Sequence, residues 1–202
     1  MNKLCILGKN SDICQQLLPK LENYDAFDRT QFDVSNHPKI QMFDFSNYNT
    51  VINFAGHSRG SYQSPIDNNW QNYVDQVNVN FIANVLIVKK YMSDNPKGRY
   101  IWLSSSTVKN CRPYQAVYGA SKSATESVFD LWKKEYPKFK FITIRIGRTK
   151  TNHMFNTFES TKTVQEVDKE YNKGPYLDAY HVADAIYQCI DFEHSFAQEI
   201  LP

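Results

Sequence analysis

Short apolar runs of strand length alternate along this chain with longer stretches of helical periodicity. The apolar runs occupy residues 4–8, 24–28, 50–54, 100–104, 139–145 and, more weakly, 199–201, and the helical patterns cover residues 11–22, 66–92, 114–136 and 178–190, with a turn expected inside the second. Strands that alternate with helices usually pair in parallel and are covered by helices. The alternation therefore predicts an α/β fold built on a parallel sheet.

The length and charge of the chain narrow this prediction. At 202 residues, without an internal repeat or a Pro/Gly-rich linker, the sequence predicts one domain. Its 23 basic and 21 acidic residues nearly balance, for a net charge of +2, which argues against nucleic acid or a membrane as its partner. The apolar stretch at residues 4–8 is too short for a signal peptide or a membrane span, so we expect a cytoplasmic protein.

The cysteines and histidines form no recognisable ligand pattern. The 4 cysteines have no Cys-x-x-Cys spacing, and the 5 histidines show no pairing typical of a metal site. We therefore expect reduced cysteines and no metal site.

One pair of side chains in the third helical pattern is suited to proton transfer. Tyr118 and Lys122 lie four residues apart, and side chains at this spacing share one face of a helix. An ammonium group beside a phenol favours the phenolate, which predicts a pKa for the tyrosine below its usual value of about 10. A second Tyr-x-x-x-Lys, Tyr136 to Lys140, has no shared helical face because Pro137 follows its tyrosine. Spacing alone is therefore a weak signal.

The first apolar run leads through a glycine into a helix, which is a possible phosphate site. Gly8 ends the run, and Ser11 and Asp12 are candidate N-caps for the helix that follows. Asp28 ends the second run, where a carboxylate can hold the hydroxyls of a ribose. With a single glycine left of a glycine-rich fingerprint, a plain strand-to-helix turn is an alternative.

Together with three further segments, these motifs occur in an order that resembles the short-chain dehydrogenase/reductase family over nearly the whole chain. The matching segments are Gly8-x-x-x-Asp12-x-Cys14, Asn53-Phe54-Ala55-Gly56, Val77-Asn78-Val79, the triplet Ser105, Tyr118 and Lys122, and Arg145-Ile146-Gly147-Arg148-Thr149-Lys150-Thr151. The resemblance implies a doubly wound parallel sheet, the Rossmann fold, as a single NAD(P)-binding domain over residues 1–202. It also implies an oxidoreductase that transfers a hydride between nicotinamide and a carbonyl or secondary alcohol.

The same resemblance implies roles for four catalytic residues. Tyr118 would be the acid/base, Lys122 would lower its pKa and hold the nicotinamide ribose, Ser105 would bind the substrate carbonyl, and Asn78 would anchor a water relay. A hydroxyl and a proton aimed at the developing alkoxide stabilise charge that appears only in the transition state, so this chemistry needs no metal. Alternatively, Asn78 caps or bends its helix and Ser105 belongs to a strand-end turn.

The resemblance also implies a set of residues that bind the dinucleotide. They are Gly8, Ser11, Asp12, Ile13, Asp28, Arg29, Asp33, Val34, Asn53, Ala55, Gly56, Tyr118, Lys122, Gly147, Thr149 and Thr151. Asp28 favours NAD because it would repel a 2′-phosphate, whereas Arg29 favours NADP, and the balance leans to NAD. The family's second and third glycines are replaced by Asp12 and Cys14, so an aspartate lies near the pyrophosphate unless it turns back to cap its helix.

Two other functions fit parts of the sequence. A sugar-nucleotide reductase or epimerase is favoured by the short connection after Asp28, which looks like that of dTDP-4-dehydrorhamnose reductases. An idle dinucleotide-binding sensor or interaction protein is favoured by the eroded glycine motif.

The substrate itself is not specified by the sequence. Residues at about 150–175 fall where family members carry a substrate lid, and a long loop is the alternative. His57, Arg59, Arg148 and Lys150 flank the expected pocket, either as ligands for an anionic substrate group or as solvated loop residues.

The two long helices also predict a homodimer or homotetramer. Val85, Tyr91, Val128, Phe129 and Trp132 are assigned to the outer faces of these helices, and a symmetric interface is a common way to bury such surface.

Overall fold

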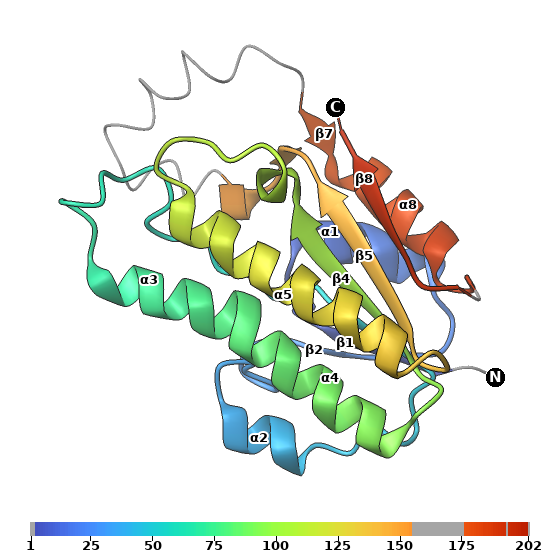
Figure 1. Ribbon diagram of the computed structural model, residues 1–202. Helices are drawn as coiled ribbons and strands as arrows, with labels where there is room; N and C mark the ends of the chain where they lie inside the picture. The colour runs from blue at the N-terminus through green and yellow to red at the C-terminus, as the bar shows by residue number, and fades with distance from the viewer. Residues whose placement is uncertain (1–2, 155–175, 193, 202) are drawn as a thin grey trace.

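The computed structural model describes residues 3–154, 176–192 and 194–201, and its main feature is a six-stranded parallel sheet (Figure 1). The strands are β1 (Leu4–Leu7), β2 (Tyr24–Phe27), β3 (Thr50–Asn53), β4 (Arg99–Ser105), β5 (Lys140–Ile146) and β8 (Phe196–Ile200). Their order across the sheet is β2-β1-β3-β4-β5-β8, and every neighbouring pair is parallel. The predicted α/β fold is confirmed.

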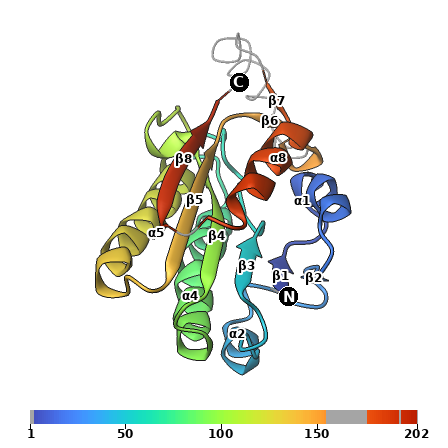
Figure 2. The same ribbon diagram turned by 90° about the vertical axis from the view of Figure 1, so that its right-hand side faces the viewer.

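Helices cover both faces of the sheet (Figure 2). The helices are α1 (Asp12–Leu17), continued by a 3₁₀ turn (Leu18–Lys20), α2 (His37–Met42), α3 (Trp70–Val77), α4 (Ala83–Asp94), α5 (Ala116–Glu135) and α8 (Ala179–Cys189). Helices α1 and α8 lie on one face, and α4 and α5 lie on the other. This is the doubly wound arrangement.

The strand order creates a crevice at one edge of the sheet. From β1 the chain moves first outward to β2 and then back across to β3 on the other side of β1. Where the winding reverses in this way, the connections leave the carboxyl ends of the two strands in opposite directions, and ligands bind between them. Gly8 directly follows β1 and Phe54 directly follows β3.

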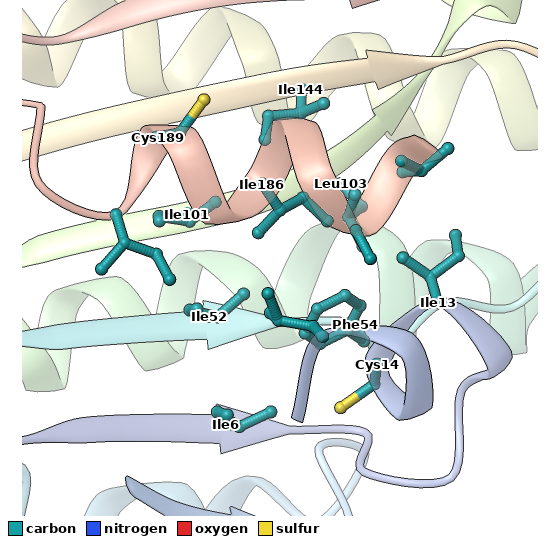
Figure 3. Close-up of a cluster of buried hydrophobic side chains, with 14 of the residues drawn as sticks. Ile6, Ile13, Cys14, Ile52, Phe54, Ile101, Leu103, Ile144, Ile186 and Cys189 are labelled. Atoms are coloured by element: carbon teal, nitrogen blue, oxygen red, sulfur yellow. The ribbon is translucent and has the colours of Figure 1, made fainter. Parts of the chain in front are cut away.

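Alternating side chains of the strands supply two separate cores. Leu4 and Ile6 of β1 point to the core beneath α1 and α8, where Leu103 and Ile186 also lie (Figure 3). The intervening Cys5 joins the core beneath α4 and α5. Burying one large apolar side chain stabilises a fold by roughly 1.5–3 kcal/mol. Both faces of the central strands are apolar for this reason.

The structure corrects the proposed outer faces of the long helices. Tyr91 and Phe129 are 0% and 1% exposed and belong to the core beneath α4 and α5. Val128 and Trp132 are half-buried and pack against that core. Large aromatic side chains on this side fill the space between helix and sheet, which helical periodicity alone does not reveal.

Several element boundaries also differ from the sequence prediction. Helix α2 was not predicted; Asn36 caps it by accepting a hydrogen bond from the backbone N–H of Lys39 at 3.1 Å. The second helical pattern begins at Trp70, and a π-helical turn (Asn78–Ile82) replaces the expected interruption. The third begins at Ala116 because Tyr114 has a φ of +64°.

The predicted lid at about 150–175 is only partly described. Strand β6 (Thr149–Lys150) pairs in parallel with β7 (Leu177–Asp178), and this small ladder was not predicted. Residues 155–175 lie outside the described residues, so the lid stays a prediction.

Candidate active site

A cavity of about 1200 Å³ opens at the carboxyl ends of β1, β3, β4 and β5. A volume above the common range for a small ligand leaves room for a cofactor and a substrate together. Of the predicted site residues, those that line it are Gly8, Ser11, Asp12, Ile13, Arg29, Asp33, Val34, Ala55, Gly56, Ser105, Tyr118, Lys122, Gly147, Thr149 and Thr151. Asp28, Asn53 and Asn78 are not part of its lining.

The turn after β1 requires a glycine. Gly8 has a φ of +82°, and a Cβ at this position would stand 2.9 Å from the backbone nitrogen of Ala55 and 3.0 Å from the carbonyl carbon of Phe54. Side chains are strained at such a φ and excluded by such contacts. The close approach brings the start of α1 and the segment after β3 to the same wall of the cavity. This geometry fits a dinucleotide, whose pyrophosphate needs backbone N–H groups without a bulky side chain between them.

The carboxylate of Asp12 does not cap its own helix. It accepts hydrogen bonds from the backbone N–H of Asn152 at 2.6 Å and from its side-chain amide at 2.9 Å. The N-cap residue of α1 is Ser11, whose hydroxyl makes no capping hydrogen bond. The negative charge that the sequence places near a pyrophosphate is therefore bound by the segment that follows β6.

The three groups of the predicted catalytic triplet meet in this cavity. Ser105 ends β4, and its hydroxyl, which donates to that of Thr107 at 2.9 Å, lies near the phenol of Tyr118 at the start of α5. The ammonium of Lys122, one turn along α5, donates to the carbonyl of Leu103 at 2.8 Å and lies 5.9 Å from the centroid of the Tyr118 ring. It also lies 4.8 Å from the centroid of the Trp102 ring, a favourable position for a cation.

The electrostatics of the pair differ from the sequence expectation. Desolvation raises the pKa of Tyr118 to about 12, although the neighbouring Ser105 hydroxyl opposes this shift. Desolvation also lowers the pKa of Lys122 to about 7, against the attraction of Glu126. Burial disfavours both charged forms, and near neutral pH this outweighs the attraction between them. The phenol is thus a proton donor in the protein alone, and the predicted lowering of its pKa is wrong for this state.

Asn80, and not Asn78, lies beside the triplet. Its side chain is completely buried, donates to the carbonyl of His57 at 2.8 Å and accepts from the N–H of His57 at 2.9 Å. A Cβ on Gly56 would stand 3.7 Å from both the Asn80 Oδ1 and the Lys122 Nζ. The π-helical turn that begins at Asn78 widens the helix, so that Asn80 rather than Asn78 makes the contacts with His57, while neither asparagine lines the cavity.

Next to Arg29, one oxygen of the Asp28 carboxylate is bound by its own turn. Its Oδ1 accepts from the N–H and hydroxyl of Thr30 at 2.8 and 2.6 Å and from the N–H of Gln31 at 3.1 Å. Arg29 lines the cavity and pairs with Asp33, with 3.1 Å between Nε and Oδ2. One oxygen of this carboxylate therefore organises the turn after β2, and its contact with a ribose stays a prediction.

Asn53 also supports the site from behind. Its side chain is fully buried, donates to Asn84 and to the hydroxyl of Tyr100, both at 3.0 Å, and accepts from the backbone N–H of Ala55 at 2.9 Å. A network whose donors and acceptors are satisfied holds the backbone rigid. We therefore correct its role from contact residue to support of Ala55 and Gly56.

The basic residues around the pocket divide into two groups. His57, Arg59 and Arg148 line the cavity. Lys150 does not line it, is exposed, and lies 3.9 Å from the carboxylate of Asp178. In the part of the chain that the structure describes, the buried Nε2 of His57 has no hydrogen-bond partner.

Several residues of the cavity wall carry no sequence signal. Tyr62 has a φ of +77°, and its N–H donates to the carbonyl of Tyr114 at 3.3 Å. Non-glycine residues with such φ values cluster at functional sites. His153 meets the hydroxyl of Ser58 at 2.7 Å, across 95 residues of sequence. Only the fold brings these groups together.

The second Tyr-x-x-x-Lys behaves as the sequence predicts. Tyr136 is the exposed C-cap of α5, and Lys140 begins β5, where its ammonium donates to the carbonyl of Pro137 at 3.2 Å. The two side chains share no helix.

The described residues contain neither a cluster suited to a metal ion nor a helix suited to crossing a membrane. Among residues 3–154, 176–192 and 194–201, no cluster of three or more His, Cys, Asp or Glu is arranged to hold a metal ion. Within the same residues, no helix combines the length and apolar character needed to cross a membrane.

The chain was compared with known sequences and structures. The profile of the short chain dehydrogenase family matches residues 2–162. No curated protein matches the sequence.

Three solved structures illustrate the structural likeness. ElxO with NADP bound is 16% identical, with a TM-score of 0.80 and 99% of this chain and 97% of that chain covered. A small-chain dehydrogenase in complex with NADPH is 18% identical, with a TM-score of 0.80 and coverage of 100% and 96%. The closed form of a serine dehydrogenase complexed with NADP⁺ is 13% identical, with a TM-score of 0.81 and coverage of 99% and 94%. At these identities the likeness concerns the fold.

Proposed function

The chain belongs to the short-chain dehydrogenase family and is an NAD(P)-dependent oxidoreductase, and we propose that it reduces a carbonyl compound, or oxidises the corresponding alcohol, with Tyr118 as the acid/base. One observation carries this proposal. Tyr118, Ser105 and Lys122 line the same cavity that continues to Gly8 and the start of α1. A catalytic triplet and a dinucleotide cradle therefore share one space.

The residues around the reacting carbon have separate roles. The nicotinamide, when bound, supplies or accepts the hydride. Tyr118, held protonated by its raised pKa, donates a proton to the oxygen that becomes an alcohol. Ser105 donates to the same oxygen, and Lys122 holds positive charge beside the phenol as the phenolate forms. Asn80 fixes the backbone at His57, which keeps the wall opposite Lys122 in place.

We also propose that NADP is the preferred form of the cofactor. The lean to NAD rested on the carboxylate of Asp28, and three hydrogen bonds within the turn after β2 occupy one of its two oxygens. The Arg29 side chain lines the cavity and is 81% exposed, and because its pairing with Asp33 uses Nε, the terminal nitrogens of the guanidinium are left for a 2′-phosphate. The NADP and NADPH complexes of the similar structures support the same choice.

The Arg29→Ala variant tests this cofactor preference. A charge-assisted contact contributes about 1.5–3 kcal/mol, so we expect NADPH to bind roughly ten- to a hundredfold more weakly to the variant, with NADH affinity unchanged. Fluorescence titration of both cofactors measures the effect. The matched control is Lys39→Ala, which removes a positive charge on α2 that does not line the cavity. Equal losses for NADPH and NADH at Arg29 would contradict the proposal.

Three polar side chains in the wall of the cavity favour a substrate with further oxygen atoms over a steroid. His57 and Arg59 line it together with Gln115, and the buried Nε2 of His57 gains a partner if the substrate brings an oxygen. An apolar substrate would leave that nitrogen without a hydrogen bond, which costs about 1–3 kcal/mol.

A panel of carbonyl compounds tests the proposed function. We expect NADPH to be consumed with hydroxylated or carboxylated ketones and aldehydes, and to a smaller extent with hydrophobic ketones of equal size. Absorbance of NADPH measures turnover, and fluorescence measures binding. Tight NADPH binding without turnover of any carbonyl would favour the idle sensor, whereas turnover only of nucleotide-linked sugars would favour the sugar-nucleotide reductase.

We further propose that two copies pair through the outer face of α3 and α5. Val77 and Ala120 border a shallow apolar hollow there, and Val74 and Leu131 are exposed on the same helices. A two-fold pairing buries such a surface against itself. A monomer by light scattering at micromolar concentration would count against this arrangement.

A further inference from the structure

Two opposite charges one turn apart on α5 do not pair with each other. Lys122 and Glu126 are 4% and 6% exposed, and they stand at i and i+4, where side chains meet. Yet the ammonium of Lys122 donates to the carbonyl of Leu103 at 2.8 Å. No ion pair between Lys122 and Glu126 occurs in the described residues.

Glu126 is instead held by Arg145 from the neighbouring strand. The Nε of Arg145 lies 2.9 Å from each carboxylate oxygen of Glu126, and a terminal nitrogen of the guanidinium donates to Oε2 as well. A guanidinium fork binds a carboxylate in a fixed orientation, which an ammonium does not. The pair is largely removed from water, with 17% and 7% of its side chains exposed.

The location of Arg145 connects this ion pair to the catalytic lysine. Arg145 in β5 lies opposite Ser104 in β4, one residue after the carbonyl that accepts from Lys122. Glu126 is thus drawn toward β5 while Lys122 reaches over β4. If the carboxylate were released, the buried ammonium one turn away would be the nearest partner for it on the same helix.

We propose that Arg145 is a positioning residue that, by binding Glu126, prevents this carboxylate from capturing Lys122 and so keeps the lysine directed at Tyr118 and the cofactor. The inference rests on the proposed function, because it assigns Lys122 a part in binding and catalysis. Two further carboxylates, those of Glu199 and Asp130, also act on Arg145, and Lys109 pairs with Glu199 at 2.9 Å.

The proposal predicts that removing the charge of Glu126 restores the kcat/KM that is lost with Arg145. Arg145→Met frees Glu126, and we expect kcat/KM to fall by about thirtyfold and NADPH affinity to weaken with it, as is typical for residues coupled in one network. Glu126→Gln alone leaves Lys122 in place, with an effect of about threefold or less. The double variant Glu126→Gln/Arg145→Met should return to within about threefold of the Glu126→Gln enzyme. Failure of this rescue would overturn the proposal.

Two readouts separate positioning from a merely structural role. In R145M the released carboxylate of Glu126 stabilises the ammonium of Lys122. The loss of NADPH affinity at alkaline pH should therefore occur at a higher pH than in the wild-type protein. In a Lys122→Met background, adding Arg145→Met should leave NADPH affinity unchanged, although thermal stability still falls. Two results would show that Arg145 only supports the fold. One is a drop in stability with no change in the pH at which NADPH affinity is lost, and the other is an equal loss of affinity in the Lys122→Met background.

Further variants keep the test decisive. Glu135→Gln removes an exposed acidic charge from the same helix and should change neither binding nor turnover. If R145M does not fold, Arg145→Lys keeps the charge but loses the fork, and a smaller effect in the same direction is expected. If the wild-type protein binds NADPH but reduces no carbonyl, the proposed function fails, whereas the affinity measurements still decide the role of Arg145.

Discussion

The Tyr118→Phe variant is expected to lose on the order of a thousandfold in turnover while binding NADPH within about twofold of the wild-type protein. The substitution removes one oxygen and keeps the ring, so the cavity wall retains its shape. Without the phenol, the oxygen that develops negative charge loses its proton donor and keeps the Ser105 hydroxyl as a hydrogen-bond donor. A thousandfold loss corresponds to about 4 kcal/mol of transition-state stabilisation.

The measurement uses the carbonyl compound that the panel identifies as the best substrate. Steady-state rates give kcat and kcat/KM, and fluorescence titration gives the NADPH affinity of each variant. Tyr136→Phe, which changes the tyrosine of the second Tyr-x-x-x-Lys, is the matched control and should turn over like the wild-type enzyme. Full activity in Tyr118→Phe would refute the acid/base assignment.

The second large effect is a dependence of cofactor affinity on pH. Lys122 has a pKa lowered to about 7 by desolvation in the protein alone, so it loses its proton as the pH rises above neutrality. An anionic dinucleotide favours the ammonium and raises this pKa on binding. Binding is therefore strongest below the pKa of the free protein and weakens as the pH rises toward the pKa of the complex. Between about pH 6 and about pH 9 we expect a loss of up to roughly a hundredfold in affinity.

Fluorescence titrations of NADPH across this pH range test the linkage. In Lys122→Met, affinity should be weaker at low pH and nearly independent of pH. Desolvation already lowers the pKa values of His57 and His153 below the usual value for histidine, so neither ring titrates in the window above neutrality. The control Lys89→Met removes an exposed lysine of α4 and should keep the full dependence. An undiminished dependence in Lys122→Met would assign the titration to another group.

Much of the fold was accessible from local patterns. Each predicted strand and each predicted long helix is present, because apolar runs and helical periodicity reflect burial that neighbouring residues share. Helix α2 and the β6–β7 ladder were missed, since a helix of 6 residues and two strands of 2 residues have too few positions to show a period. The lengths of these elements, rather than their chemistry, made them invisible.

The site was predicted less completely than the fold. Gly8, Ser105, Tyr118 and Lys122 were found because their spacing relative to strand ends and to one helix is preserved in the structure. The choice between Asn78 and Asn80 depended on a π-helical turn, and the role of Asp28 depended on which donors its own turn would present. Neither is encoded in a spacing rule.

The sequence by itself determined the parallel sheet, the glycine at its crevice and the placement of a tyrosine and a lysine on one helical face, because each depends on residues close together in the chain. Only the tertiary structure decided how these groups behave. Desolvation reversed the expected shift in the pKa of Tyr118, and Arg145, from a different strand, bound the carboxylate that would otherwise meet Lys122. Electrostatic interactions in a protein depend on burial and on distances between residues far apart in sequence, and these exist only once the chain has folded.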